Sequence, residues 1–212
     1  MILTVGDSFT YGQELSDRHS DSWPMVLGRK LDQGVYNLAV PAGSNDRMFR
    51  VAVDRVVQNE YELVICGWTE VSRIDTTVNG KELQITSGST WLHGKYPWVK
   101  QYYANHYSER LAQETWLTKV IALQDFFKQR NQKYIFVNMN GYSNWETYFD
   151  ELGLMHLIEQ IDKSNYVGWP DDGFTAFVNG APLGPNGHPL ELGHQRIADK
   201  IYEHIRNKQW FS

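Results

Sequence analysis

Short apolar runs alternate with amphipathic stretches along the first third of the chain. Residues 1–5, 35–40 and 63–67 are mostly apolar, and the continuous character of the last run is typical of a strand covered on both faces. Residues 23–33 and 46–59 repeat apolar side chains at helical spacing. Strand and helix therefore alternate with short connections, which predicts a parallel sheet with helices on both faces.

The alternation is interrupted once and then resumes. Asn79-Gly80 lies at the centre of residues 76–85, and this dipeptide is typical of a β-hairpin turn. We expect a small insertion at about residues 75–97 that overhangs the carboxyl edge of the third strand. The pattern after it predicts the following elements: two helical pieces within 98–130, strands at 133–139 and 166–167, and a last helix over 190–206. A single domain over residues 1–212 is expected, since no linker or repeat divides the chain.

Composition excludes several classes of protein. The 212 residues carry a net charge of −5 with no basic stripe, which argues against nucleic-acid binding. No stretch reaches the roughly 18 apolar residues that a membrane span requires. The first strand begins at residue 2 with no signal peptide before it, so we expect a cytoplasmic protein. The lone cysteine, Cys66, lies within an apolar run and is interpreted as a core residue.

A serine and a histidine occupy positions where a parallel sheet can bring them together. Ser8 directly follows the first strand, in a turn that Gly6 and Asp7 favour. His188 lies in the loop just before the last helix. Ligands of open α/β folds bind at the carboxyl ends of the strands, where both loops are expected. A serine hydroxyl needs a base to take its proton, and histidine suits that role, so the pair suggests acyl transfer.

Acyl transfer also needs hydrogen-bond donors for the oxyanion. The N–H of Ser8 is one candidate, and the loop after the second strand offers the N–H of Gly43 and the side-chain amide of Asn45. The alternative is that Ser44 or Asn45 simply caps the helix that begins at about Asp46. Both interpretations can hold at once.

These motifs together resemble the SGNH/GDSL hydrolases. Residues 6–12, Gly-Asp-Ser-Phe-Thr-Tyr-Gly, are similar to the first block of that family, residues 37–45 to the second, and Gly187-His188-Pro189 to the last. The resemblance implies a flavodoxin-like three-layer α/β/α fold with a five-stranded parallel sheet. It also implies ester hydrolysis without a metal or other cofactor, with Ser8 as nucleophile, His188 as base and Gly43 as an oxyanion donor.

The chain departs from the family pattern at two places. The family's third block carries an asparagine as oxyanion donor, and Thr69 stands at that place here. The family's last block has an acid three residues before the histidine, and here that residue is Pro185. We therefore expect His188 to be oriented by a backbone carbonyl or by an acid from the preceding loop, Asp171 or Asp172. Asn45 or Thr69 would complete the oxyanion site.

The residues that follow the third strand are candidates for substrate binding: Trp68, Glu70 and Arg73. The guanidinium of Arg73 suits an anionic group of a substrate, and the alternative is a surface ion pair with Glu70. The histidines show no metal-like spacing, so no metal site is expected. His194, on the apolar face of the last helix, is interpreted as structural.

The sequence therefore predicts a serine esterase that cleaves a small acyl ester. Several aromatic residues lie in expected loops and could stack on a sugar, so a carbohydrate ester is one candidate substrate. One alternative is a catalytically silent module that binds a glycan or a protein on the same scaffold. Another is an acyltransferase, because the acyl-enzyme is common to transfer and hydrolysis. The oligomeric state stays open.

Overall fold

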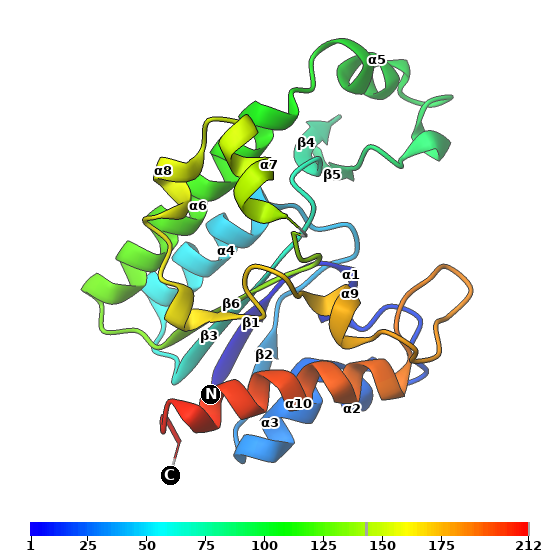
Figure 1. Cartoon of the computed structure of the whole chain (residues 1–212). Coiled ribbons are helices and arrows are strands. Elements are labelled where there is room, and N and C mark those ends of the chain that lie inside the picture. Colours follow the sequence, from blue (N-terminus) through cyan, green and yellow to red (C-terminus); the bar gives the residue numbers. More distant parts are fainter. Residues whose placement is uncertain (143, 212) are drawn as a thin grey trace.

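The core of the protein is a five-stranded parallel sheet. A computed structural model describes residues 1–142 and 144–211 (Figure 1). The strands lie in the order β2-β1-β3-β6-β7, and every neighbouring pair is parallel. Their bounds are as follows: β1 Ile2–Val5, β2 Val35–Asn37, β3 Leu63–Trp68, β6 Tyr134–Asn138 and β7 Tyr166–Val167. This order confirms the predicted flavodoxin-like sheet, in which the connection direction reverses between β1 and β3.

Helices cover both faces of the sheet, which confirms the three-layer α/β/α architecture (Figure 1). Helices α3 (Trp23–Leu31) and α10 (Glu191–Asn207) pack on one face, and α4 (Asn45–Gln58) and α6 (Glu109–Gln129) pack on the other. Alternation along the strands explains this division, since successive side chains point to opposite faces. In β3, Val64 and Cys66 face α4 and α6, whereas Leu63 and Ile65 face α3 and α10.

Shorter helices occupy the connections. Their bounds are as follows: α1 Ser8–Tyr11, α2 Arg18–Asp21, α7 Trp145–Glu151, α8 Met155–Ile158, α9 Phe174–Phe177, η1 Thr90–Leu92 and η2 Lys163–Asn165. Both α1 and α9 lie near the carboxyl edge of the sheet (Figure 1).

The predicted hairpin is present as β4 (Ile74–Val78) and β5 (Lys81–Ile85). Asn79 and Gly80 have φ angles of 52° and 73°, the left-handed conformation that a tight two-residue turn requires at both positions. Asp75 fastens the hairpin to α4, because its carboxylate accepts the Ser44 hydroxyl at 2.7 Å and pairs with Arg50 at 3.0 Å. With α5 (Pro97–Asn105), the hairpin projects beyond the carboxyl edge of the sheet (Figure 1).

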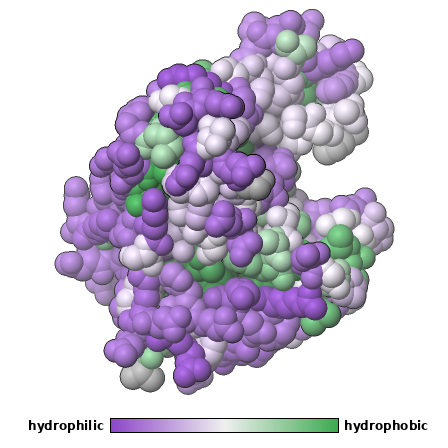
Figure 2. Space-filling model, viewed as in Figure 1, coloured by the Kyte–Doolittle hydropathy of each residue, from purple (hydrophilic) through white to green (hydrophobic). Residues whose placement is uncertain are grey.

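The surface is hollowed at this edge. Figure 2 shows an indentation between the projecting α5 region and the part of the molecule that contains α9 and the loop before α10. The residues that follow β1, β3 and β6 lead toward this side of the molecule. Within the described residues, no helix has both the length and the apolar character needed to cross a membrane.

Candidate active site

Ser8 is the first residue of α1 and directly follows β1. Asp7 caps this helix, and its Oδ1 accepts the N–H of Phe9 at 3.0 Å. The helix ends after one turn at Gly12, whose N–H donates to the Ser8 carbonyl at 3.1 Å with φ at 82°. Ser8 itself is only 6% exposed. Within residues 1–142 and 144–211, its N–H has no hydrogen-bond acceptor, so this donor is available to an oxyanion.

His188 lies in the loop between α9 and α10, with a carboxylate beside it. Its Nδ1 atom is 3.0 Å from Oε2 of Glu14. The His188 carbonyl accepts the N–H of Gly184 at 2.8 Å, which closes the loop. The edge of the ring packs against Phe9, with 6.0 Å between the ring centroids. Because Phe9 follows Ser8 directly, these contacts bring the histidine loop next to the serine turn.

Glu14 organises the whole histidine loop. Besides contacting the imidazole, its carboxylate accepts the backbone N–H of Asn186 at 2.9 Å, the Asn186 amide at 2.7 Å and the backbone N–H of His188 at 3.1 Å. Desolvation acts to raise the pKa of Glu14, but these hydrogen bonds outweigh it and lower the pKa to about 2. The carboxylate of Glu14 is therefore ionised at neutral pH.

The backbone near the Glu14 carboxylate has two unusual features, a positive φ at Glu14 and a close approach by Gly184. Glu14 has a φ of 71°, a conformation that non-glycine residues rarely adopt outside special sites. Gly184 leaves the space that the carboxylate needs, since a Cβ there would lie 2.7 Å from Glu14 Oε2.

The expectation that Asp171 or Asp172 supports His188 is wrong for this structure. Both aspartates are exposed, and no hydrogen bond joins either side chain to His188 among the described residues. The carboxylate comes instead from the loop after α1, more than 170 positions away in the sequence. Local spacing before His188 therefore gives no indication of it.

Ser8 and His188 are not joined by a hydrogen bond in the part of the chain that the structure describes. Their surroundings are nevertheless shared, because Phe9 contacts the imidazole ring and Asp7 lies close enough for the charge of His188 to affect its pKa. Hydrogen bonds between catalytic groups are often long in ligand-free enzymes and shorten when substrate binds.

Asp7, the residue before Ser8, forms a buried ion pair with Arg73. Asp7 is fully buried, and its Oδ2 accepts the Thr69 hydroxyl at 2.7 Å and pairs with Nη1 of Arg73 at 3.0 Å. Burial raises the pKa of Asp7, while Arg73, Thr69 and the N–H of Phe9 act to lower it. Arg73 lies 4.0 Å from Glu70. The expected ion pair between Arg73 and Glu70 is therefore present, but the closer carboxylate partner of Arg73 is Asp7, which the sequence did not indicate. Binding of a substrate anion by Arg73 stays a prediction.

The three predicted oxyanion residues are all bonded elsewhere. The Gly43 N–H donates to the Val40 carbonyl at 3.1 Å. The Asn45 amide is held by the Thr69 backbone, donating to its carbonyl at 3.0 Å and accepting its N–H at 2.9 Å. The Thr69 hydroxyl donates to Asp7. These hydrogen bonds position the strand ends. Among the described residues, the Ser8 N–H and the second N–H of the Asn45 amide are the predicted donors without a hydrogen-bond acceptor. The alternative for Ser44 is confirmed, since its hydroxyl caps α4.

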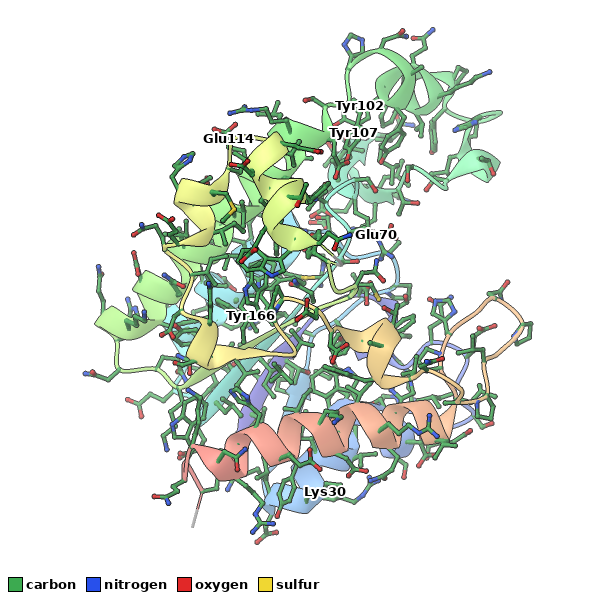
Figure 3. The ribbon with its side chains drawn as sticks, viewed as in Figure 1. Lys30, Glu70, Tyr102, Tyr107, Glu114 and Tyr166 are labelled. Carbon is green, nitrogen blue, oxygen red and sulfur yellow. The ribbon has the colours of Figure 1, made fainter. Side chains whose placement is uncertain are left out.

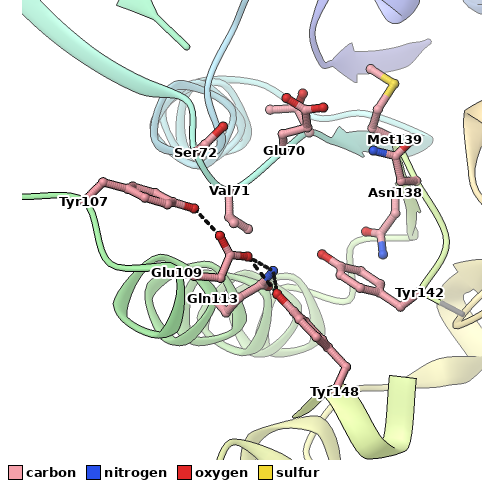
Figure 4. Close-up of a pocket in the computed structure, with 12 residues that line it drawn as sticks. Glu70, Val71, Ser72, Tyr107, Glu109, Gln113, Asn138, Met139, Tyr142 and Tyr148 are labelled. Atoms are coloured by element: carbon pink, nitrogen blue, oxygen red, sulfur yellow. Dashed lines mark hydrogen bonds between the residues drawn. The ribbon is translucent and has the colours of Figure 1, made fainter. Parts of the chain in front are cut away.

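Trp68 is not available to a substrate, because it is 1% exposed and packs edge-on against Phe136 in the core. Glu70 is exposed and is one of the residues that line a cavity of about 330 Å³ at the ends of β3 and β6 (Figure 4). Tyrosine, amide and carboxylate side chains line this cavity: Tyr107, Glu109, Gln113, Asn138, Asn140, Tyr142 and Tyr148. We call it the tyrosine pocket. Thr69 also lines the tyrosine pocket. Because the Thr69 hydroxyl donates to Asp7, the pocket lies next to the turn that carries Ser8.

His194 is structural, as its position predicted. It is fully buried, and its Nδ1 accepts the backbone N–H of Trp23 at 3.1 Å, which ties α10 to α3. Burial lowers the pKa of His194 to about 4, with a smaller effect from His188. The imidazole is therefore neutral at neutral pH.

No cluster of three or more metal-ligating side chains occurs among the described residues. The arrangement of Ser8, His188 and Glu14 instead has the composition of a serine hydrolase triad. Sequence reasoning missed Glu14 and the Asp7–Arg73 pair. The available signal was a carboxylate only six residues after the serine, in a loop at the same edge of the sheet.

Solved structures of similar fold include esterases and lipolytic proteins. One is a protein assigned to the G-D-S-L family of lipolytic proteins from Desulfitobacterium hafniense, with 15% identity, a TM-score of 0.57, and coverage of 96% of this chain and 98% of that one. Another is the psychrotrophic esterase EstA from Pseudoalteromonas sp., with 13% identity, a TM-score of 0.59, and coverage of 98% and 97%.

A catalytic mutant of an acetylxylan esterase from Geobacillus stearothermophilus has 12% identity and a TM-score of 0.55, with coverage of 100% of this chain and 95% of that one. A search among curated proteins finds no match. A family model described as a family of unknown function, DUF6071, matches residues 10–211. The chain therefore belongs to the DUF6071 family, and its fold is that of a divergent SGNH/GDSL hydrolase.

Proposed function

We propose that this protein is a serine ester hydrolase with Ser8 as nucleophile, His188 as base and Glu14 as the acid that orients the histidine. The observation that carries the proposal is the 3.0 Å contact between Glu14 Oε2 and His188 Nδ1, next to a turn that presents Ser8 at the end of β1. A carboxylate bonded to Nδ1 directs Nε2 toward the substrate side, where it can take the serine proton.

The reaction divides into two steps. In the first, the Ser8 oxygen attacks the ester carbonyl while His188 takes the hydroxyl proton, and the same proton then goes to the leaving alcohol. In the second, His188 takes a proton from water, water attacks the acyl-enzyme, and Ser8 is released as the free hydroxyl. The Ser8 N–H supports the oxyanion in both steps. With few free donors in the site, turnover is expected to be slow and to favour esters with good leaving groups.

The substrate is proposed to be a small acyl ester, with a carbohydrate as the alcohol part. The support is the tyrosine pocket beside Thr69, together with the fact that structures of the same fold include acetylxylan esterases.

The test is hydrolysis of p-nitrophenyl acetate by the purified protein. Ser8→Ala is expected to reduce the rate to that of the uncatalysed reaction, whereas Ser16→Ala, in the exposed loop after α1, leaves it unchanged. A fluorophosphonate should label Ser8 and no other serine in a peptide map. Equal rates for wild type and Ser8→Ala would remove Ser8 from the mechanism.

The second candidate is a silent binding protein on the same scaffold. It is favoured by the engagement of Gly43, Asn45 and Thr69 in structural hydrogen bonds. The same assay separates the two, because a silent protein shows no rate that depends on Ser8 and no fluorophosphonate labelling at that residue.

A further inference from the structure

The tyrosine pocket contains a network of hydrogen bonds centred on the Glu109 carboxylate, together with amide groups that are not fully hydrogen-bonded. The Glu109 carboxylate accepts the hydroxyl of Tyr107, the hydroxyl of Tyr148 at 2.7 Å and the amide of Gln113 at 3.0 Å (Figure 4). Desolvation acts to raise the pKa of Glu109, but these hydrogen bonds outweigh it and lower the pKa. The pocket therefore holds a fixed negative charge beside aromatic rings.

Gln113 is nearly inaccessible at 2% exposure, and the network decides which of its atoms is free. Its Nε2 donates to Glu109 and to the Tyr148 hydroxyl, each at 3.0 Å. Its Oε1 is consequently left as a buried acceptor with no partner in the part of the chain that the structure describes. A ligand in the cavity that donates a hydrogen bond would satisfy this atom.

Asn138 is fixed in the complementary orientation on the other side of the pocket. Its Oδ1 accepts the Tyr166 hydroxyl at 2.6 Å, so its amide NH₂ is the group left for the pocket (Figure 4). The pocket thus offers an acceptor from Gln113 and a donor from Asn138. A hydroxyl group can both donate and accept, so neighbouring hydroxyls on one ligand would satisfy both.

The negative charge of the lining residues also limits which ligands can bind in the tyrosine pocket. Glu70 and Glu109 line the pocket, whereas none of its lining side chains is a lysine, an arginine or a histidine. Burial raises the pKa of Tyr142, a hydrogen bond with Gln113 acts to lower it, and the charges of Tyr148, Glu109 and Glu70 act to raise it. Figure 3 shows Glu70 and Tyr107 on the same side of the molecule. An anionic ligand would meet repulsion here with no compensating cation.

We propose that the tyrosine pocket binds an uncharged, polyhydroxylated sugar ring and discriminates against sugars that carry a carboxylate. The ring would pack its apolar face on the tyrosine side chains and direct its hydroxyls to Gln113 and Asn138. This inference rests on the proposed function insofar as the sugar is the alcohol part of the ester. Thr69 lines the pocket and donates its hydroxyl to Asp7, the residue before Ser8, so the pocket lies next to the turn that carries the serine.

The first experiment compares two esters that differ only in charge: a mono-O-acetylated methyl glucoside and the corresponding methyl glucuronide. The wild type is expected to hydrolyse the uncharged ester with a kcat/KM about 10-fold higher, the effect of two carboxylates acting through a partly aqueous pocket. Glu109→Gln should reduce the ratio several-fold. Glu114→Gln, five residues further along α6 and paired with Arg110 outside the pocket, should leave the ratio as in wild type.

A second measurement does not depend on the variants folding. Raising the salt concentration from about 0.01 M to 1 M shortens the screening length from about 30 Å to 3 Å, so the wild-type ratio should fall toward unity. Equal rates for the two esters at low salt, or a preference for the glucuronide, would overturn the proposal.

The third measurement separates this inference from the proposed function. Binding of methyl glucoside and methyl glucuronide to Ser8→Ala is measured by calorimetry, which requires no turnover. Binding of the glucoside alone by a protein that does not hydrolyse p-nitrophenyl acetate supports the pocket and rejects the esterase. Hydrolysis of p-nitrophenyl acetate without binding of either glycoside supports the esterase and rejects the sugar pocket.

Discussion

Glu14 and His188 lie in direct contact, with 3.0 Å between Oε2 and Nδ1, although 174 positions separate them in the sequence. The SGNH pattern places an acid three residues before the histidine, where this chain has Pro185, and the carboxylate beside His188 is that of Glu14. The same carboxylate also holds the backbone of the histidine loop through Asn186 and His188. Glu14 therefore fixes both the ring and the loop that carries it.

The first prediction concerns this carboxylate. Glu14→Gln should reduce kcat on p-nitrophenyl acetate by about 10²- to 10⁴-fold, because an amide neither fixes the imidazole tautomer nor supports the imidazolium. Asp172→Asn serves as the control and should retain wild-type activity, since Asp172 is exposed and makes no hydrogen bond to His188. A large loss in the control and none in Glu14→Gln would reverse the assignment of the acid.

The second prediction uses the space that Gly184 provides. A Cβ at this position would lie 2.7 Å from Glu14 Oε2 and 2.8 Å from its Cδ. Gly184→Ala should therefore displace the carboxylate from His188 and lower kcat/KM by roughly 10²-fold, the effect of a displacement of about 1 Å at a catalytic group. The matched control is Gly34→Ala, where an added Cβ meets no atom within 4 Å. Full activity in Gly184→Ala would mean that the carboxylate position does not limit the reaction.

The third prediction concerns the buried ion pair behind Ser8. Arg73→Met removes the cation beside the fully buried Asp7 and should lower the free energy of unfolding by about 3 kcal/mol, because it leaves a buried carboxylate unpaired. In the double variant Asp7→Asn/Arg73→Met, the loss should be smaller than the sum of the two single losses. Urea denaturation measures all three variants, and additive losses would show that Asp7 and Arg73 do not interact energetically.

The fourth prediction concerns the pH dependence of stability. His194 has a pKa of about 4 in the folded protein, lowered chiefly by burial, against an ordinary value of 6.5 in the unfolded chain. The unfolded state therefore binds a proton that the folded state does not between these two values. The free energy of unfolding should fall as the pH is lowered from about 6.5 to 4, by about 3 kcal/mol in total from this residue.

His194→Asn provides the comparison for that measurement. The asparagine oxygen can replace Nδ1 as the acceptor for the Trp23 N–H but does not titrate. The difference in unfolding free energy between wild type and the variant should thus change with pH in this window and be constant above it. A difference that does not vary with pH would show that folding does not lower the pKa of His194.

Much of the scaffold could be predicted from the sequence, because its determinants are local. Hydrophobic periodicity predicted the parallel strands, the helices on both faces and the last helix. The dipeptide Asn79-Gly80 predicted the hairpin. Ser8 lies at the end of β1 as expected. These features depend on side chains within a few residues of one another, so a linear pattern contains the necessary information.

The contacts of the site depended on tertiary structure. Hydrogen bonds join Glu14 to His188, Thr69 to Asp7 and Asn45 to the Thr69 backbone, each between loops that follow different strands. Sequence reasoning placed Asn45 and Thr69 at the correct edge but could not tell that their polar groups were already bonded. It also took Trp68 for a substrate residue, although β3 continues one residue further and turns that side chain into the core.

The physical reason lies in what each level of structure fixes. Strand and helix periodicity is a local property, so the linear pattern is enough to predict which residues reach the carboxyl edge of the sheet. Which polar groups meet there depends on how the loops pack, because a carboxylate accepts a hydrogen bond from any donor within about 3 Å. The pairing of Glu14 with His188 is one of the contacts that depend on loop packing.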